Sequence, residues 1–305
     1  MKNAAGLLLL LALALAPAAA QPAPKNDPAL ETVIVTAPRL HAGVTPNAIA
    51  HDFVKSFAAP TVLRDAIARW QVAICPQFIG VAPNFAEVME TRLRTIAGQA
   101  GAPMKEKGCK PNLTVAVTPQ PQAYLDALHA KNVEALGYHG ATTVTHPVQA
   151  WYVTGTQDVR GTEFLDKDAF FVLNIFGGGG IDPMSTAPLT NTGGWRDHPD
   201  LSSDLLYVTI IVDSSKTGTL MVGEIADYVA MLALSRTEDY DDCQLMPSIA
   251  NLLSSRCDDK LKPSEITPTD IAYLRGVYKM DAGATLQIQQ DQIAGEMASA
   301  LAGGK

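Results

Sequence analysis

The chain has 305 residues, of which 47% are hydrophobic, and its 23 Lys and Arg face 31 Asp and Glu, for a net charge of −8. This acidic balance and the lack of any Lys/Arg cluster argue against nucleic acid and anionic lipid as partners, because both require a positive surface. The length is sufficient for one large domain or two small ones.

The N-terminus has the pattern of a secretory signal peptide in residues 1–20. Lys2 precedes an apolar run from Leu7 to Ala16, and small residues stand before Gln21. The apolar run is about half as long as the ~20 residues that a membrane-spanning helix needs. We therefore expect a periplasmic or secreted protein with no integral membrane segment once the signal is removed.

Residues 21–55 are expected to form a flexible N-terminal segment that is rich in Pro and Ala at its start. Within it, residues 31–39 (Glu-Thr-Val-Ile-Val-Thr-Ala-Pro-Arg) resemble the TonB box of outer-membrane receptors, an extended strand that adds to a partner's sheet edge. The alternative is that residues 31–39 form an edge strand or a linker that follows the signal peptide. A single globular domain is expected over residues 56–305.

Hydrophobic periodicity predicts a helix over residues 61–70 and a second one that Asn84 caps and that ends near Gly98 to Gly101. The buried stripe expected for the second helix is Phe85, Val88, Met89, Leu93 and Ile96. The further predicted elements are strands at 113–118, 148–154, 169–175 and 205–212 and a short helix at 122–129. This succession predicts an α/β (α+β) layered domain.

Four cysteines are present, and an even number in an exported chain indicates disulfides. Three connectivities are possible, and pairing of sequence neighbours gives Cys75–Cys109 and Cys243–Cys257. A four-cysteine zinc site is the alternative, but the chain has no Cys-x-x-Cys pair.

Residues 223–236 predict a helix that is apolar on nearly every side and hence buried. Glu224 and Asp227 lie near its start, where negative charge meets the positive end of the helix dipole. They are three residues apart, so they are neighbours on the helix surface and form the candidate catalytic pair.

Three segments together resemble the core of the metzincin metalloproteases: this helix, the turn at 247–250, and residues 266–278, which are similar to the closing helix of matrixins. The metzincin motif is His-Glu-x-x-His followed by a glycine and a third histidine. Overlaid on this chain, the ligand positions fall on Ala226, Ala230 and Arg236, and the general-base position falls on Asp227. The resemblance implies a mixed sheet with a central buried helix, no metal and no cofactor. The whole chain also resembles exported proteins of alphaproteobacterial type with no assigned function.

Three functional hypotheses follow. The first is a non-catalytic metzincin-like protein that binds a peptide or an unknown envelope protein in the groove beside its central helix. The second is a metal-independent hydrolase that uses Glu224 and Asp227. The third is an envelope adaptor that docks through residues 31–39. Trp151 and Tyr152, which alternate across a predicted strand, are candidate binding residues. The histidines include no i,i+4 pair, so no other metal site is predicted.

Overall fold

The computed structural model describes residues 45–131, 133–137, 140–158, 163–166, 201–238 and 240–303, all within one compact unit, Ala37–Lys305. The strands are β1 (Pro76–Ile79), β2 (Leu113–Thr118), β3 (Val148–Asp158), β4 (Glu163–Leu165) and β5 (Leu201–Asp213). The α-helices are α1 (Pro46–Phe57), α2 (Pro83–Ala100), α3 (Pro121–Lys131), α6 (Ser214–Thr217), α7 (Val222–Leu234), α8 (Pro268–Lys279) and α9 (Leu286–Gly303). Short 3-10 helices are η1 (Val133–Leu136), η2 (Ile249–Asn251) and η3 (Asp259–Leu261). The predicted signal peptide, the segment 31–39 and the predicted strand 169–175 lie outside the described residues.

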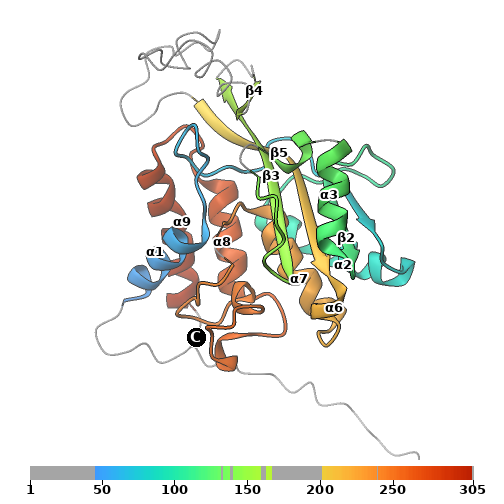
Figure 1. The fold of residues 1–305 in the computed structure, drawn as a ribbon. Coiled ribbons are helices and arrows are strands. Elements are labelled where there is room, and N and C mark those ends of the chain that lie inside the picture. Colours follow the sequence, from blue (N-terminus) through green and yellow to red (C-terminus); the bar gives the residue numbers. More distant parts are fainter. Residues whose placement is uncertain are drawn as a thin grey trace, which may run out of the picture. The chain divides into compact units, whose positions relative to one another are not determined.

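The described strands form one mixed sheet in the order β1-β2-β5-β3-β4 (Figure 1). β1, β2 and β5 are parallel, whereas β3 runs antiparallel to β5 and β4 antiparallel to β3. β4 pairs only with Gly155–Gln157 of β3. In the described part of the chain, no strand therefore pairs with the outer edge of β3 from Val148 to Thr154. The predicted α/β layered fold with a mixed sheet is confirmed.

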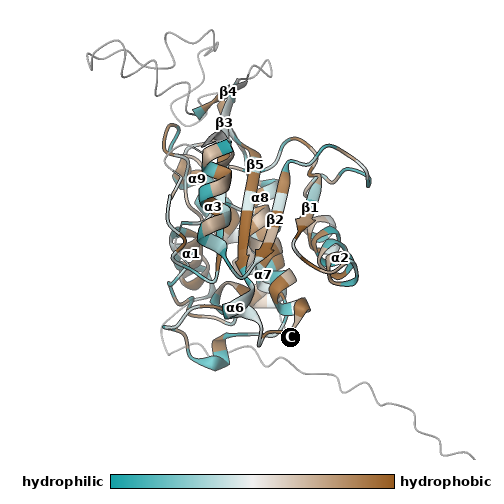
Figure 2. Cartoon of the chain, turned by 45° about the vertical axis from the view of Figure 1, so that its right-hand side comes forward, coloured by the Kyte–Doolittle hydropathy of each residue, from teal (hydrophilic) through white to brown (hydrophobic). Residues whose placement is uncertain are grey.

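Helices cover both faces of this sheet. On one face, Val208 and Ile210 of β5 pack in the main core with α2, α7 and α8. On the other face, Ile211 and Trp151 pack with Leu125 of α3 and Leu136 of η1. Because alternate residues of β5 enter two cores, the strand is apolar along most of its length (Figure 2). A layer of α1, α8 and α9 packs beyond α7 (Figure 1).

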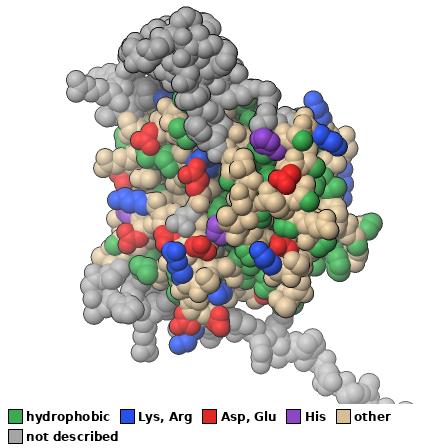
Figure 3. Space-filling model, in the orientation of Figure 1, with side chains coloured by type: hydrophobic (Ala, Val, Ile, Leu, Met, Phe, Trp, Pro, Cys, Tyr) green, Lys and Arg blue, Asp and Glu red, His purple; other side chains and the backbone are tan. Residues whose placement is uncertain are grey.

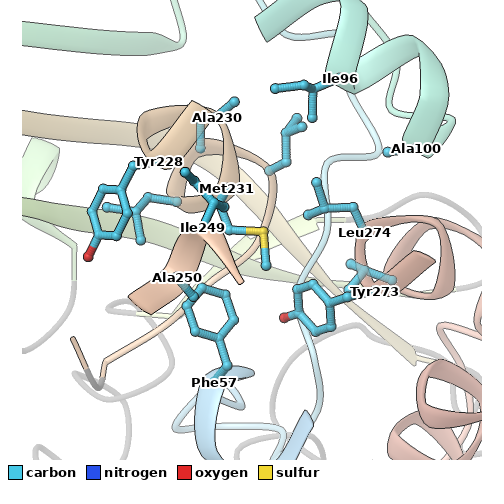
Figure 4. Packing of buried hydrophobic residues seen from close by; sticks show 14 of the residues in the cluster. Phe57, Ile96, Ala100, Tyr228, Ala230, Met231, Ile249, Ala250, Tyr273 and Leu274 are labelled. Carbon is cyan, nitrogen blue, oxygen red and sulfur yellow. The ribbon is translucent and has the colours of Figure 1, made fainter. Parts of the chain in front are cut away.

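The central helix α7 is buried as predicted. Every residue from Ala226 to Leu234 is shielded from solvent. Figure 4 shows Met231 among Ile249, Tyr273 and Leu274, which come from η2 and α8. No helix in the described part of the chain has the length and apolar character needed to cross a membrane.

The predicted helix over residues 61–70 is wrong. Asp65 adopts a left-handed backbone with φ 51°, and Thr61 N–H bonds to Ala66 O across a turn. The following residues are extended, and Arg69 forms a parallel bridge with Asp204 of β5. The apolar residues Ile67 and Trp70 are buried as the periodicity suggested, but tertiary contacts bury them from an extended chain rather than a helix.

The predicted boundary at residue 56 also needs correction, because helix α1 begins at Pro46. Thr45 caps it with its side chain, and Pro46 occupies the first turn. Phe53 and Phe57 are buried, with their ring centroids 5.2 and 5.6 Å from that of Tyr273 on α8. The folded region therefore includes residues 46–55, the last ten residues of the segment expected to be flexible.

Helix α2 matches its prediction in position but not in its full buried stripe. Met89, Leu93 and Ile96 are buried, whereas Phe85 and Val88 are 44% and 42% exposed. Hydrophobic side chains are visible at that edge of the molecule, where α2 starts (Figure 3). The helix starts at Pro83, so Asn84 lies inside it and is not its N-cap.

Both predicted disulfides are present. Cys75 and Cys109 are joined with a Cα–Cα distance of 6.0 Å, and Cys243 and Cys257 with one of 5.0 Å. Cys75 stands directly before β1 and Cys109 shortly before β2, so the first bond ties together the starts of two parallel strands. Such bonds persist in oxidising compartments.

Candidate functional site

The positions that the metzincin resemblance assigns to zinc ligands lie in different surroundings. Ala226 and Ala230 are 1% and 0% exposed and belong to the main core. Arg236 lies two residues after the end of α7 and lines a pocket beside β3. In the described part of the chain, no group of three or more His, Cys, Asp or Glu side chains is arranged to hold a metal ion.

Asp227 is held in a structural ion pair. Its two carboxylate oxygens accept from Nε and Nη2 of Arg92 on α2, each at 2.5 Å. One of the oxygens also accepts from Ile266 N–H at 2.8 Å, just before α8. The side chain is fully buried, whereas that of Arg92 is 36% exposed. Asp227 therefore links α2, α7 and the start of α8, and its carboxylate faces away from open solvent.

Glu224 caps the start of α7. Its carboxylate accepts from Met221 N–H at 2.7 Å, so it satisfies one of the backbone donors left open at a helix N-terminus. The two members of the predicted carboxylate pair thus bind different partners. The structure does not bring them together at a shared reacting position.

Asp270 of α8 joins the other two segments of the resemblance. It is fully buried and accepts from Ser248 Oγ at 2.5 Å, Ile249 N–H at 3.0 Å, and Thr267 N–H and Oγ1 at 2.9 and 2.8 Å. Burial raises the pKa of Asp270, and these hydrogen bonds oppose the rise. The turn around Ser248 and the start of α8 are therefore fixed to each other by one carboxylate.

Three aromatic side chains donate hydrogen bonds to carbonyls at the C-terminal end of α7. Tyr152 Oη donates to Leu232 O at 3.0 Å, Trp70 Nε1 to Ala233 O at 2.7 Å and Tyr278 Oη to Leu234 O at 2.9 Å. These are carbonyls of the last helical turn, which have no partner within the helix. The hydroxyl of Tyr152, a predicted binding residue, thus has a structural partner.

A pocket of about 240 Å³ lies beside β3 and the chain that follows α7. Its lining residues are Leu136, Gly140, Ala141, Gln149, Ala150, Trp151, Tyr152, Arg236, Thr237, Glu238 and Tyr240. The predicted binding residues Trp151 and Tyr152 therefore meet at one pocket. No residue of α7, Glu224 and Asp227 included, lines it, so it is not the predicted groove beside the central helix. The Trp151 side chain itself is buried, and its Nε1 donates to Ala141 O at 2.7 Å.

Tyr240 closes the sheet edge at this pocket. Its hydroxyl accepts from Ala150 N–H at 3.1 Å and donates to Ala150 O at 3.2 Å, so it satisfies both groups that a neighbouring strand would otherwise bind. Burial raises the pKa of Tyr240 to about 12, so the phenol keeps its donor proton at neutral pH. The ring of His146 lies 4.9 Å from that of Tyr240.

Sequence reasoning missed the segment Arg236–Tyr240 as part of a binding site. In the sequence, Arg236 was noted only at a zinc-ligand position where it cannot bind the metal. The signal available was its place directly after a fully apolar helix, in a run of charged residues, since a polar segment that leaves the core beside a sheet edge often lines a site. Comparison of the chain with protein-family models, with curated proteins and with solved structures gives no match.

Proposed function

We propose that this chain is a non-catalytic, metzincin-like protein that acts outside the cytoplasm by binding a peptide or another protein at the pocket beside β3. One observation carries the non-catalytic part. The carboxylate at the position of the general base is engaged by Arg92 and Ile266 with three hydrogen bonds and is fully buried. A base needs a free lone pair within reach of the proton it accepts, and Asp227 faces its structural partners instead.

The metzincin-like part is supported by contacts between segments far apart in the sequence. Asp227 of the central helix binds the backbone at Ile266, and Asp270 binds the turn at Ser248 and Ile249. The three segments that carry the resemblance thus form one connected unit. The antiparallel strand β3 lies beside this unit, since Tyr152 bonds to the last turn of α7.

The extracytoplasmic location is supported by the two disulfides, because thiols are kept reduced in the cytosol. The adaptor hypothesis rests on residues 31–39, which lie outside the described residues. The hydrolase hypothesis gains no support, because Glu224 and Asp227 have separate partners.

Peptide selection, followed by binding measurements on a variant whose pocket is blocked, tests the proposal. Peptides are selected from a displayed library on the immobilised mature protein and then titrated against Ala141→Trp, which fills the pocket mouth from an exposed position. Ala123→Trp, an equally exposed change on α3, is the control. We expect Ala141→Trp to lose at least about tenfold in affinity, Ala123→Trp to bind like the wild type, and the peptides to remain uncleaved. Peptide cleavage, or equal binding by both variants, would refute the proposal.

A further inference from the structure

With Glu238, Arg236 is one of the two charged residues that line the pocket. Its side chain is only 10% exposed, yet it lines the pocket. Nη1 donates to Pro60 O at 2.5 Å, which fixes the side chain from behind. Nη2 donates to Glu238, which lines the same pocket. A buried arginine at the wall of a small cavity is a fixed positive charge with a defined direction.

The counter-ion of Arg236 is exposed to solvent. Glu238 is 67% exposed, lies two residues along the chain and meets the guanidinium through one oxygen. Only the glutamate half of this pair is in contact with water, which screens its charge, and the Glu238 side chain loses freedom when it is held there. An arginine binds a carboxylate best through two parallel hydrogen bonds, and Glu238 does not make both.

Asp166 is a buried carboxylate that feels the charge of Arg236, but its hydrogen bonds go to other residues. Asp166 accepts from the hydroxyls of Thr154 and Thr156 on β3. Burial raises its pKa, although the charge of Arg236 opposes that rise. Among the described residues, Arg236 donates hydrogen bonds only to Pro60 and Glu238. A guanidinium has five N–H groups, so other N–H groups of Arg236 can bind a ligand.

We propose that the pocket recognises a carboxylate, which displaces Glu238 and binds Arg236 through two hydrogen bonds. The inference rests on the proposed function, since it names the group recognised at the same pocket. The volume of about 240 Å³ is below that of a pocket for a drug-sized ligand, so a chain end or a small acid fits better than a long segment. Two sources share this chemistry: the C-terminus of a peptide and a free small carboxylic acid.

Calorimetric titration with matched probes tests the inference. The probes are acetyl-trialanine with a free carboxylate, the same peptide as its C-terminal amide, and propionate. They are titrated into the wild type, Glu238→Gln and Glu106→Gln, the last being an equal charge change at an exposed glutamate that does not line the pocket. Arg236→Lys keeps the charge but removes the two-pronged geometry.

We expect the free-carboxylate peptide to bind at least about tenfold more tightly than the amide. Removal of the internal competitor in Glu238→Gln should tighten binding of the acid about fivefold, with Glu106→Gln unchanged, and Arg236→Lys should weaken it about tenfold. Tighter binding of propionate than of the peptide acid would assign the site to small acids; the reverse would assign it to peptide ends.

Equal affinities for acid and amide would overturn the inference, as would equal behaviour of Glu238→Gln and Glu106→Gln or no binding of either acid. If Arg236→Lys does not fold, the comparison of Glu238→Gln with Glu106→Gln still decides. A failure of carboxylate recognition can be distinguished from a failure of the proposed function. A selected peptide that binds through the pocket without dependence on a carboxylate leaves the proposed function standing, whereas cleavage of peptides refutes that function only.

Discussion

Replacement of Arg92 by Met is expected to destabilise the protein by about 3 kcal/mol, because it leaves the fully buried carboxylate of Asp227 without its counter-ion. The remaining bond from Ile266 N–H does not neutralise the charge. Urea unfolding followed by circular dichroism measures this loss. The additional change Asp227→Asn should recover part of it, since a neutral side chain needs no counter-ion.

Arg94→Met is the matched control for this experiment. Arg94 lies on the same helix and pairs with Glu90 at 2.9 Å, but both side chains of that pair are partly exposed. We expect a loss of under about 1 kcal/mol for this variant. Equal losses for Arg92→Met and Arg94→Met would show that Asp227 does not depend on Arg92, and the structural role assigned to Asp227 would be wrong.

The second large effect is expected at Asp270. Asp270→Ala leaves the hydroxyls of Ser248 and Thr267 and the N–H groups of Ile249 and Thr267 without their acceptor in a site that water does not reach. Each unsatisfied buried donor carries a desolvation cost, and we expect a total of about 4 kcal/mol. Thermal and urea unfolding at matched protein concentration measure it.

Thr267→Ala serves as the comparison for Asp270→Ala. It removes the N-cap hydroxyl, which accepts from Asp270 N–H at 3.1 Å, but leaves the carboxylate and most of its donors in place. A loss of about 1 kcal/mol is typical for such a cap. If Asp270→Ala cost no more than Thr267→Ala, the carboxylate would not be what fixes the turn around Ser248 to α8.

Strands β2, β3 and β5 and the central helix could be predicted because their signals are local, whereas the short strands β1 and β4 were not predicted. β5 and α7 are nearly unbroken apolar runs, and the helix α8 carries the cap residue Thr267 followed by proline. Cysteine pairing by proximity was also correct. The fold class follows from the order of these elements, so it needed no long-range information.

The failures have a common physical cause. Residues 61–70 show helical spacing, but their backbone groups pair with β5 and with Gln289 of α9, which no local pattern reveals. Helix α1 follows a segment rich in Pro and Ala, and its burial depends on Tyr273, more than two hundred residues away. Long-range contacts decided the structure at both places.

The candidate site shows the same limit. Glu224 and Asp227 are neighbours by helical spacing, yet one caps the helix and the other reaches across to α2. Tyr152, a predicted binding residue, does line the pocket, but its hydroxyl donates to Leu232 O in the last turn of α7. The pocket itself combines β3 with Arg236 and Tyr240, and this juxtaposition exists only in the folded chain.

The zinc content of the mature protein decides whether this chain is a metal-free scaffold. The protein is purified from the periplasm of cells grown with added zinc, dialysed without chelator, and analysed by mass spectrometry of the elements together with its molar concentration. Because Ala226 and Ala230 supply no ligand and Asp227 is held by Arg92, we predict well under about 0.1 zinc per chain. About one tightly held zinc per chain would contradict the account of a metzincin-like scaffold that binds without catalysis.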